Sequence, residues 1–274
     1  MVLNRVYSTS KGFLKSAREN IVRTTVNGLC ILFFLGYKMG GGSSAHSNDV
    51  FDYRFSGISV WLEPGEDDAL TQDSCSVTPL NRLKRKMSDL AETCGGPSQG
   101  LHPFQPHATV LYNMPKASVL AHSALDGSES DRLKDASTTL LNRCLEEYAT
   151  VRKEDGTNHL ELRPTSTYAV FCPPFRCSIS LFILELTRDM DKLHKIACKV
   201  FPQDERHQSG GTLHPHISLI YAPVNSLKLL QADANKLAKE EPFLLEPLRA
   251  KYLSVWSTEG TISEWKRIAR VEIP

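Results

Sequence analysis

The sequence predicts an α/β (α+β) protein made of two similar lobes. Strand-like and helix-like segments alternate from about residue 51, the second half repeats the plan of the first, and one seven-residue pattern occurs in each half. A length of 274 residues is enough for one large or two small domains with a sizeable core. We therefore expect a folded region at 51–274, with lobes at about 51–155 and 156–274.

The first lobe is expected to begin with a β-branched strand at 57–62, which Glu63-Pro64-Gly65 ends. A helix at 79–93 follows, because leucines and a methionine recur there every three or four residues before a Gly-Gly-Pro stop. Apolar residues predict a strand at 107–112. A second leucine-faced helix is expected at 131–148, and a turn near Asp155-Gly156 closes the lobe.

The second lobe repeats this plan by the same criteria. Apolar runs predict its strands, and leucines at helical spacing predict its helices. In chain order we expect strands at 160–171 and 177–186, a helix at 189–201, a strand at 216–221, a helix at 225–239, and strands at 248–256 and 265–272.

The seven-residue pattern reads Pro-His-x-Thr/Ser-apolar-apolar-Tyr and covers residues 106–112 and 215–221. The apolar residues after each histidine predict a strand, and residues two apart on a strand point to the same face. Each histidine and its hydroxyl neighbour are therefore expected side by side, His107 with Thr109 and His216 with Ser218.

Two such pairs facing each other suit the cleavage of a phosphodiester. Histidine can act as a base or an acid near neutral pH, so His107 and His216 are the candidate acid–base pair. Thr109 and Ser218 are the candidate donors to the non-bridging phosphate oxygens. Which histidine is the acid and which is the base stays open at this point. The scheme requires no metal and no cofactor, and His214 and His216, two apart, have no third metal ligand of evident spacing.

Both motifs resemble the H-x-T/S signature of the two-histidine (2H) phosphoesterase superfamily. The segment Ser59-Val60-Trp61-Leu62-Glu63-Pro64 and the residues 255–256 and 265–268 narrow the resemblance to the cyclic phosphodiesterase (2′,3′-cyclic-nucleotide 3′-phosphodiesterase-like) family. The resemblance covers about residues 57–274. It implies a bilobal fold with two pseudo-symmetric antiparallel sheets, outer helices and a central cleft, and terminal strands that cross between lobes.

The resemblance also implies an activity. This is the metal-independent hydrolysis of nucleoside 2′,3′-cyclic phosphates to 2′-phosphate products, with ADP-ribose 1″,2″-cyclic phosphate as a further candidate substrate. Two alternatives stay open: a 2H phosphodiesterase that processes RNA ends, and a non-catalytic module that binds nucleotide or RNA. The expected partners are thus a small cyclic nucleotide or RNA ends. We expect a monomer without a stable protein partner.

Two aromatic residues are candidate substrate contacts. The resemblance suggests that Tyr221 lines the phosphate or base pocket, although five residues after His216 a regular strand would point it to the opposite face. A bulge or a strand end would be needed. Trp61 is either buried packing or a platform for the nucleobase. We expect Tyr112 in the core. The weaker histidines are expected to be surface or capping residues: His102, His122, His159, His194 and His207.

The first 50 residues read as an N-terminal extension for targeting or as a disordered segment. Residues 1–38 carry six basic residues against one acid, which resembles a mitochondrial transit peptide, and the apolar run at 28–37 is too short to span a bilayer. A start at Met39 would create an N-myristoylation pattern. We expect a cytoplasmic protein, or a mitochondrial one if 1–38 is a transit peptide.

Charge and cysteine content restrict the function further. The net charge of +1 implies no general attraction to polyanions. The seven cysteines lack the paired spacing of a zinc site. A disulfide between Cys172 and Cys177 and a fully reduced chain both stay open.

Overall fold

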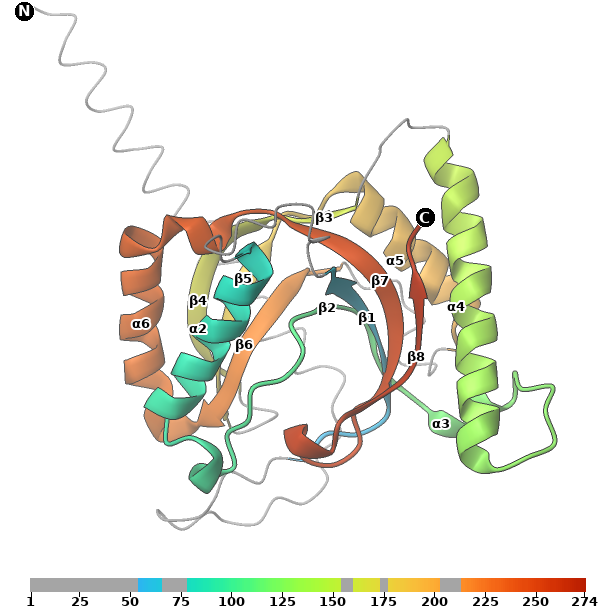
Figure 1. Ribbon diagram of the computed structural model, residues 1–274, viewed down its shortest axis with the longest axis horizontal. Coiled ribbons are helices and arrows are strands. Elements are labelled where there is room, and N and C mark those ends of the chain that lie inside the picture. Colours follow the sequence, from blue (N-terminus) through green and yellow to red (C-terminus); the bar gives the residue numbers. More distant parts are fainter. Residues whose placement is uncertain (1–53, 66–77, 154–159, 173–176, 203–212) are drawn as a thin grey trace, which may run out of the picture. The chain divides into compact units, whose positions relative to one another are not determined.

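The computed structural model of this chain describes most of the region expected to fold (Figure 1). The described residues are 54–65, 78–153, 160–172, 177–202 and 213–274. Cys172 apart, they belong to one compact unit. The expected N-terminal extension and the turn near 155–156 lie outside the described residues, so these expectations stay predictions.

Strands and helices alternate along the described chain as expected. The strands are β1 (Ile58–Pro64), β2 (Ala108–Met114), β3 (Glu161–Leu162), β4 (Pro164–Cys172), β5 (Cys177–Leu184), β6 (His216–Pro223), β7 (Leu248–Ser257) and β8 (Lys266–Glu272). The helices are α2 (Pro79–Thr93), α3 (Lys116–Leu120), α4 (Glu129–Lys153), α5 (Arg188–Val200) and α6 (Leu227–Glu240). Short 3₁₀ turns cover Pro97–Gln99, Val224–Ser226, Pro242–Leu245 and Ile262–Glu264.

All these strands form one eight-stranded sheet in the order β3–β7–β1–β2–β6–β5–β4, with β8 also paired with β7. The registered neighbours run antiparallel, which confirms the α+β class. β7 pairs with β1 along the whole length of β1, with Trp61 opposite Ser254. The end of the chain thus completes the part of the sheet that the first half begins.

The two sheets expected from the resemblance are joined where the motif strands meet. β2 and β6 are paired through one residue of each strand, Ala108 opposite Ile217. On one side of this junction lie β1, β7, β8 and β3, and on the other lie β5 and β4. The sheet is therefore continuous, and its narrowest connection lies between the two histidine motifs.

Each side of this junction is covered by a pair of helices (Figure 1). α4 packs against β7 and β8, and its neighbour α5 packs against β2. α2 packs against β6, and α6 packs against β5. Because α2 precedes the first motif and α5 precedes the second, each motif strand is covered by a helix from the other half of the sequence.

The helices begin where the sequence places caps. The Thr78 side chain accepts from Asn81 N at 3.2 Å at the start of α2, and Thr187 accepts from Met190 N at 3.2 Å at the start of α5. The bounds predicted for α2 are confirmed. α4 is longer than predicted, and the five-residue helix α3 was not predicted because so short a segment shows no periodicity.

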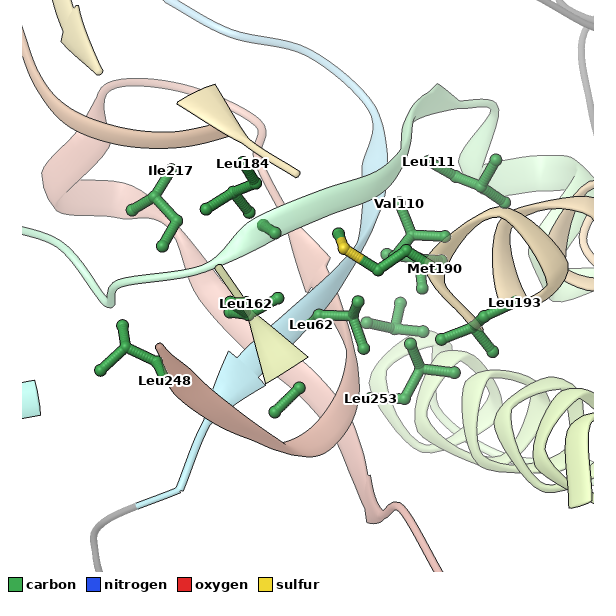
Figure 2. Close-up of a cluster of buried hydrophobic side chains, with 14 of the residues drawn as sticks. Leu62, Val110, Leu111, Leu162, Leu184, Met190, Leu193, Ile217, Leu248 and Leu253 are labelled. Carbon is green, nitrogen blue, oxygen red and sulfur yellow. The ribbon is translucent and has the colours of Figure 1, made fainter. Parts of the chain in front are cut away.

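The core lies between the sheet and these helices. Figure 2 shows leucine, valine and methionine side chains from β1, β2, β7 and α5 in contact with one another. Leu62, Val110 and Met190 are each at most 5 % exposed. The packed layer behind β2 holds this strand in place, and it leaves the other face of the strand for the motif side chains.

β2 carries a bulge immediately after its motif hydroxyl. Trp61 of β1 is opposite Thr109, and the preceding residue Val60 is opposite Leu111. Val110 is thus left without a partner on β1. A bulge of this kind bends the strand and releases backbone groups from the ladder.

β6 carries a bulge at the equivalent position. Leu181 of β5 is opposite Ser218, and Ser180 is opposite Ile220, so Leu219 is left without a partner on β5. In both motifs the extra residue directly follows the hydroxyl. The repeat seen in the sequence is therefore also a repeat of backbone geometry.

A histidine from α5 contacts the bulge of β2. His194 is half-buried and its Nδ1 bonds to the carbonyl oxygen of Val110 at 3.0 Å. The expectation that His194 is a surface or capping residue holds only in part, because the ring is half-buried and lies away from the ends of α5. Its ring instead satisfies a buried carbonyl that the bulge releases from the ladder.

This contact generates a prediction on stability. We expect His194→Ala to lower the free energy of unfolding by about 1–2 kcal/mol, because a buried carbonyl loses its partner. Urea denaturation of the purified protein measures this change. The exposed His122 supplies the control, and His122→Ala is expected to stay within about 0.5 kcal/mol of the parent protein. Equal effects of the two replacements would contradict the assigned contact.

Candidate functional site

The two motif histidines lie at the junction of β2 and β6. His107 directly precedes β2 and is 4 % exposed, and His216 is the first residue of β6 and is half-buried. Ala108 and Ile217, the next residues of the two motifs, are the pair that joins the strands. Residues 109 apart in sequence are thereby brought to adjacent strands.

The same register places the motif hydroxyls beside the histidines. Extended by one residue in each direction, it puts His107 opposite Ser218 and Thr109 opposite His216. Directly opposite residues of an antiparallel pair have Cβ atoms about 4.5–5.5 Å apart on one face of the sheet. The four side chains thus occupy neighbouring positions on the same face.

Each imidazole is held by a hydrogen bond of the same design. His107 Nδ1 is 2.7 Å from the carbonyl oxygen of Gln105, and His216 Nδ1 is 3.0 Å from that of His214. A carbonyl only accepts, so Nδ1 carries the proton and donates in both rings. In the neutral ring this leaves the lone pair on Nε2 for another partner.

Burial keeps both histidines neutral in the resting protein. Burial away from water lowers the pKa of His107 to about 3. The hydrogen bond to the Gln105 carbonyl raises this pKa, and the nearby His216 lowers it further. Burial also lowers the pKa of His216. The hydrogen bond to the His214 carbonyl raises this pKa, and the His214 ring lowers it. Both Nε2 atoms can therefore accept a proton at neutral pH.

The bulge of β6 brings Tyr221 to the histidine face. One extra residue reverses the alternation after Ser218, and the Tyr221 hydroxyl lies 3.0 Å from Ser218 Oγ. The sequence required a bulge or a strand end for this contact, and the bulge supplies it. The equivalent Tyr112 is 41 % exposed, so the expectation that it lies in the core is wrong.

Aromatic rings surround Tyr221. Its ring centroid is 5.1 Å from that of Phe55, 5.7 Å from Phe104 and 6.2 Å from Trp265. Phe104 is also 5.9 Å from the His107 ring. Phe55 and Phe104 were not predicted as site residues, because a lone aromatic residue outside a motif gives no sequence pattern. The rings give the histidine face an apolar surrounding in which electrostatic interactions are stronger than in water.

Trp61 does not offer a free surface to a nucleobase. It is 2 % exposed, one ring face is stacked on His107, and another ring contact is made by Trp256. The expectation that Trp61 is a base platform is therefore wrong. Its other expected role, buried packing, agrees with the structure, and its packing partner is a motif histidine.

Two ring nitrogens near the motif residues are buried and have no hydrogen-bond partner within the described part of the chain. They are His214 Nε2 and Trp265 Nε1. His214 precedes the second motif, and the Trp265 ring is 5.7 Å from that of Trp61. A polar group of a bound ligand could satisfy such atoms.

The described ranges contain neither a metal-ligand cluster nor a helix that could span a membrane. Within them, no group of three or more histidine, cysteine, aspartate or glutamate side chains is arranged to hold a metal ion. Among the described helices, none is long and apolar enough to cross a membrane. The buried Cys172 and Cys177 end β4 and begin β5.

Comparisons with known proteins return structural likenesses alone. No protein-family model and no curated protein matches the chain. Usb1 of Kluyveromyces marxianus is 12 % identical, with 82 % of this chain and 99 % of that chain covered and a TM-score of 0.41. LigT of E. coli in complex with 3′-AMP is 8 % identical, with 81 % and 98 % covered and a TM-score of 0.35. A structure described as a phosphoesterase is 9 % identical, with 81 % and 98 % covered and a TM-score of 0.37.

Identities and TM-scores this low give no basis for transferring an activity to this chain. The chain resembles the two-histidine phosphoesterases in its repeated motif, and its α+β fold with an antiparallel sheet is the class that this resemblance implies. Its chemistry follows from its own residues.

The burial of His107 generates a prediction on protonation. We expect its imidazole to stay neutral between pH 8 and about pH 4 without ligand, since burial lowers its pKa to about 3. ¹⁵N NMR of histidine-labelled protein reports the state of Nε2, and His107→Ala identifies the resonance. Inorganic phosphate should raise this pKa, because an adjacent anion favours the imidazolium. Titration near pH 6.5 without ligand would contradict the buried environment.

Proposed function

We propose that this chain is a metal-independent phosphodiesterase that hydrolyses nucleoside 2′,3′-cyclic phosphates to 2′-phosphate products, and that opens the cyclic phosphate of ADP-ribose 1″,2″-cyclic phosphate in the same way. The observation that carries the proposal is the pair of motif imidazoles on adjacent strands, each with Nδ1 bound to a carbonyl. This arrangement supplies two Nε2 atoms for proton transfer at one phosphate.

Opening a cyclic phosphate needs one proton removed and one delivered. Water adds to phosphorus while the bond from phosphorus to the ribose oxygen breaks. The Nε2 atom of one histidine takes the proton of the water, and the imidazolium of the other gives its proton to the leaving oxygen. The two rings exchange protonation states in each turnover, and solvent restores the starting state.

The substrate itself helps to prepare the acid. Both rings are neutral at rest because burial lowers the pKa of His107 and of His216. One of them has to bind a proton before it can act as the acid. The negative charge of the phosphodiester favours this imidazolium, so protonation and substrate binding are coupled.

The hydroxyl groups complete the phosphate contacts. Thr109 and Ser218 donate to the non-bridging oxygens, where charge increases in the transition state. The hydroxyl groups of Ser218 and Tyr221 are 3.0 Å apart and form a hydrogen bond. One hydroxyl donates to the other, which leaves one hydroxyl proton for a phosphate oxygen. With Ser218 donating to a phosphate oxygen, Tyr221 donates to Ser218 Oγ and holds that hydroxyl in place, so its proposed substrate-binding role is to line the phosphate pocket.

A second candidate, the processing of RNA ends by the same residues, is favoured by two arginines on β8. A bulge at Ile268 puts Arg267 and Arg270 on one face of the strand. The Arg270 guanidinium is 4.1 Å from the Tyr252 ring centroid, and the Arg267 guanidinium is 5.6 Å from that of Trp256. Arginine on an aromatic ring suits the backbone and bases of a single strand.

Replacement of either motif histidine tests the catalytic roles. We expect His107→Ala and His216→Ala each to lower turnover by about 10²–10⁴-fold, the usual loss for a general acid or base. The substrate is a nucleoside 2′,3′-cyclic phosphate, and circular dichroism checks the fold. His122→Ala is the matched control and should keep full activity. A folded variant of either motif histidine with near-normal turnover refutes the assignment.

A chelator assay tests metal independence and separates the candidates. We expect EDTA to leave the hydrolysis of a nucleoside 2′,3′-cyclic phosphate unchanged, because imidazoles and hydroxyls supply every step. Chromatography measures the amount of product formed. Turnover restricted to oligonucleotides would favour RNA-end processing, and binding without turnover would favour a non-catalytic module. Loss of activity in EDTA, restored by a divalent cation, would overturn the proposed mechanism.

A further inference from the structure

The His107 imidazole is stacked flat on the indole of Trp61. The two ring centroids are 3.4 Å apart and the ring planes are inclined by 7°. His107 is 4 % exposed and Trp61 is 2 % exposed, so the stack is shielded from water. A parallel contact at this distance fixes the plane of the imidazole, because rotation about its side-chain bonds would drive the ring edge into the indole.

The stack continues beyond Trp61. The Trp256 ring centroid is 4.5 Å from that of Trp61 with an interplanar angle of 23°, and the Arg267 guanidinium is 5.6 Å from the Trp256 centroid. We call His107, Trp61, Trp256 and Arg267 the ring column. His107 directly precedes β2, and the other three lie on β1, β7 and β8; these four strands are successive neighbours in the sheet.

A buried carboxylate holds the far end of the ring column. Glu63 is 1 % exposed and accepts hydrogen bonds from Trp256 Nε1 at 2.7 Å, from Arg267 at 3.0 Å and from Ser254 Oγ at 2.5 Å. Burial of a charge is costly unless it is paired and hydrogen-bonded, and these three partners of Glu63 lie in or beside the column. Glu63 therefore restrains the edge of Trp256 and the guanidinium that covers it.

Two restraints together define the direction of the reactive nitrogen. The bond from His107 Nδ1 to the Gln105 carbonyl, 2.7 Å long, fixes rotation within the ring plane. The contact with Trp61 fixes the plane itself. With both present, Nε2 has a single direction, which is what an acid or base needs at a phosphate.

The backbone fold does not by itself require an aromatic residue at the position of Trp61. Trp61 is opposite Thr109, and the equivalent position beside the second motif, opposite Ser218, is Leu181. Because both motifs have the same register and the same bulge, an aliphatic residue is compatible with this backbone. The tryptophan is thus a feature of the first motif.

We propose that Trp61 is a positioning residue for His107, and that Trp256, anchored by Glu63, supports Trp61 from behind. The expected effect of Trp61 on kcat rests on the proposed phosphodiesterase function. The stacking of Trp61 on His107 can be measured without turnover. Trp61 contacts the imidazole and no reacting atom. Its loss should therefore affect the chemical step more than substrate binding.

The first experiment compares Trp61→Leu with Trp61→Phe on a nucleoside 2′,3′-cyclic phosphate. Trp61→Leu installs the residue found beside the second motif and is expected to lower kcat by about 10–100-fold, with KM changed by less than about threefold, because a misplaced imidazole slows proton transfer. Trp61→Phe keeps an aromatic face and should retain kcat within about threefold of the parent protein.

The matched control removes a buried ring elsewhere. Tyr148 of α4 is fully buried, so Tyr148→Leu reproduces the loss of packing without altering the stack. We expect it to lower the melting temperature and leave kcat unchanged. If Trp61→Leu and Tyr148→Leu reduce kcat equally, or if folded Trp61→Leu keeps kcat within about twofold, the proposal is overturned.

A second variant and a spectroscopic measurement cover the case in which Trp61→Leu does not fold. The half-buried Trp256 tolerates truncation more easily, and Trp256→Leu should lower kcat by about 3–10-fold at unchanged KM through the loosened support of Trp61. In ¹H NMR the His107 ring protons should be shifted upfield by the indole, and this shift should shrink in Trp256→Leu. Unchanged kcat and an unchanged shift would overturn the proposal.

The spectroscopic result also separates this proposal from the proposed function. If the parent protein does not hydrolyse any cyclic phosphate, the function fails, while the upfield shift of His107 and its loss on Trp256→Leu still test the stack. If the parent protein is active and the variants behave as the control does, the function stands and the positioning role fails.

Discussion

The pairing of β2 with β6 through Ala108 and Ile217 is the constraint on which the site depends. This one register brings together two histidines that are far apart in sequence. A shift by one residue would turn the motif side chains of one strand to the helix side, because side chains alternate along a strand. The pairing is short, so the helices and the leucine-rich core behind the strands have to hold the register (Figure 2).

The two bulges turn a local sequence pattern into a three-dimensional site. A regular strand would put Tyr221 on the face opposite His216, whereas the extra residue at Leu219 returns it to Ser218. The same irregularity at Val110 releases a carbonyl, and His194 from α5 bonds to it. Bulges near functional residues re-aim side chains in this way.

The repeated motifs share their local geometry and differ in their surroundings. Each histidine donates through Nδ1 to the carbonyl two residues earlier, and burial lowers the pKa of each ring. Trp61, however, contacts His107, while Leu181 holds the equivalent register position in the second motif. Acid–base catalysis needs two groups with different tasks, and differences in packing are one way for similar motifs to provide them.

Local periodicity and caps were enough to predict the class of fold, the bounds of α2 and the approximate positions of the strands, although the single strand expected at 160–171 is two strands, β3 and β4. The two-residue spacing likewise predicted each histidine on the same strand face as its hydroxyl neighbour. Local patterns did not predict which strand lies beside which, where the bulges fall, or that Trp61 packs on a histidine instead of facing a ligand. Those outcomes depend on contacts between residues 40 to 200 positions apart, such as Trp61 with His107 and Trp256. A strand pattern reports which face is apolar and carries no information on the partner that will cover it.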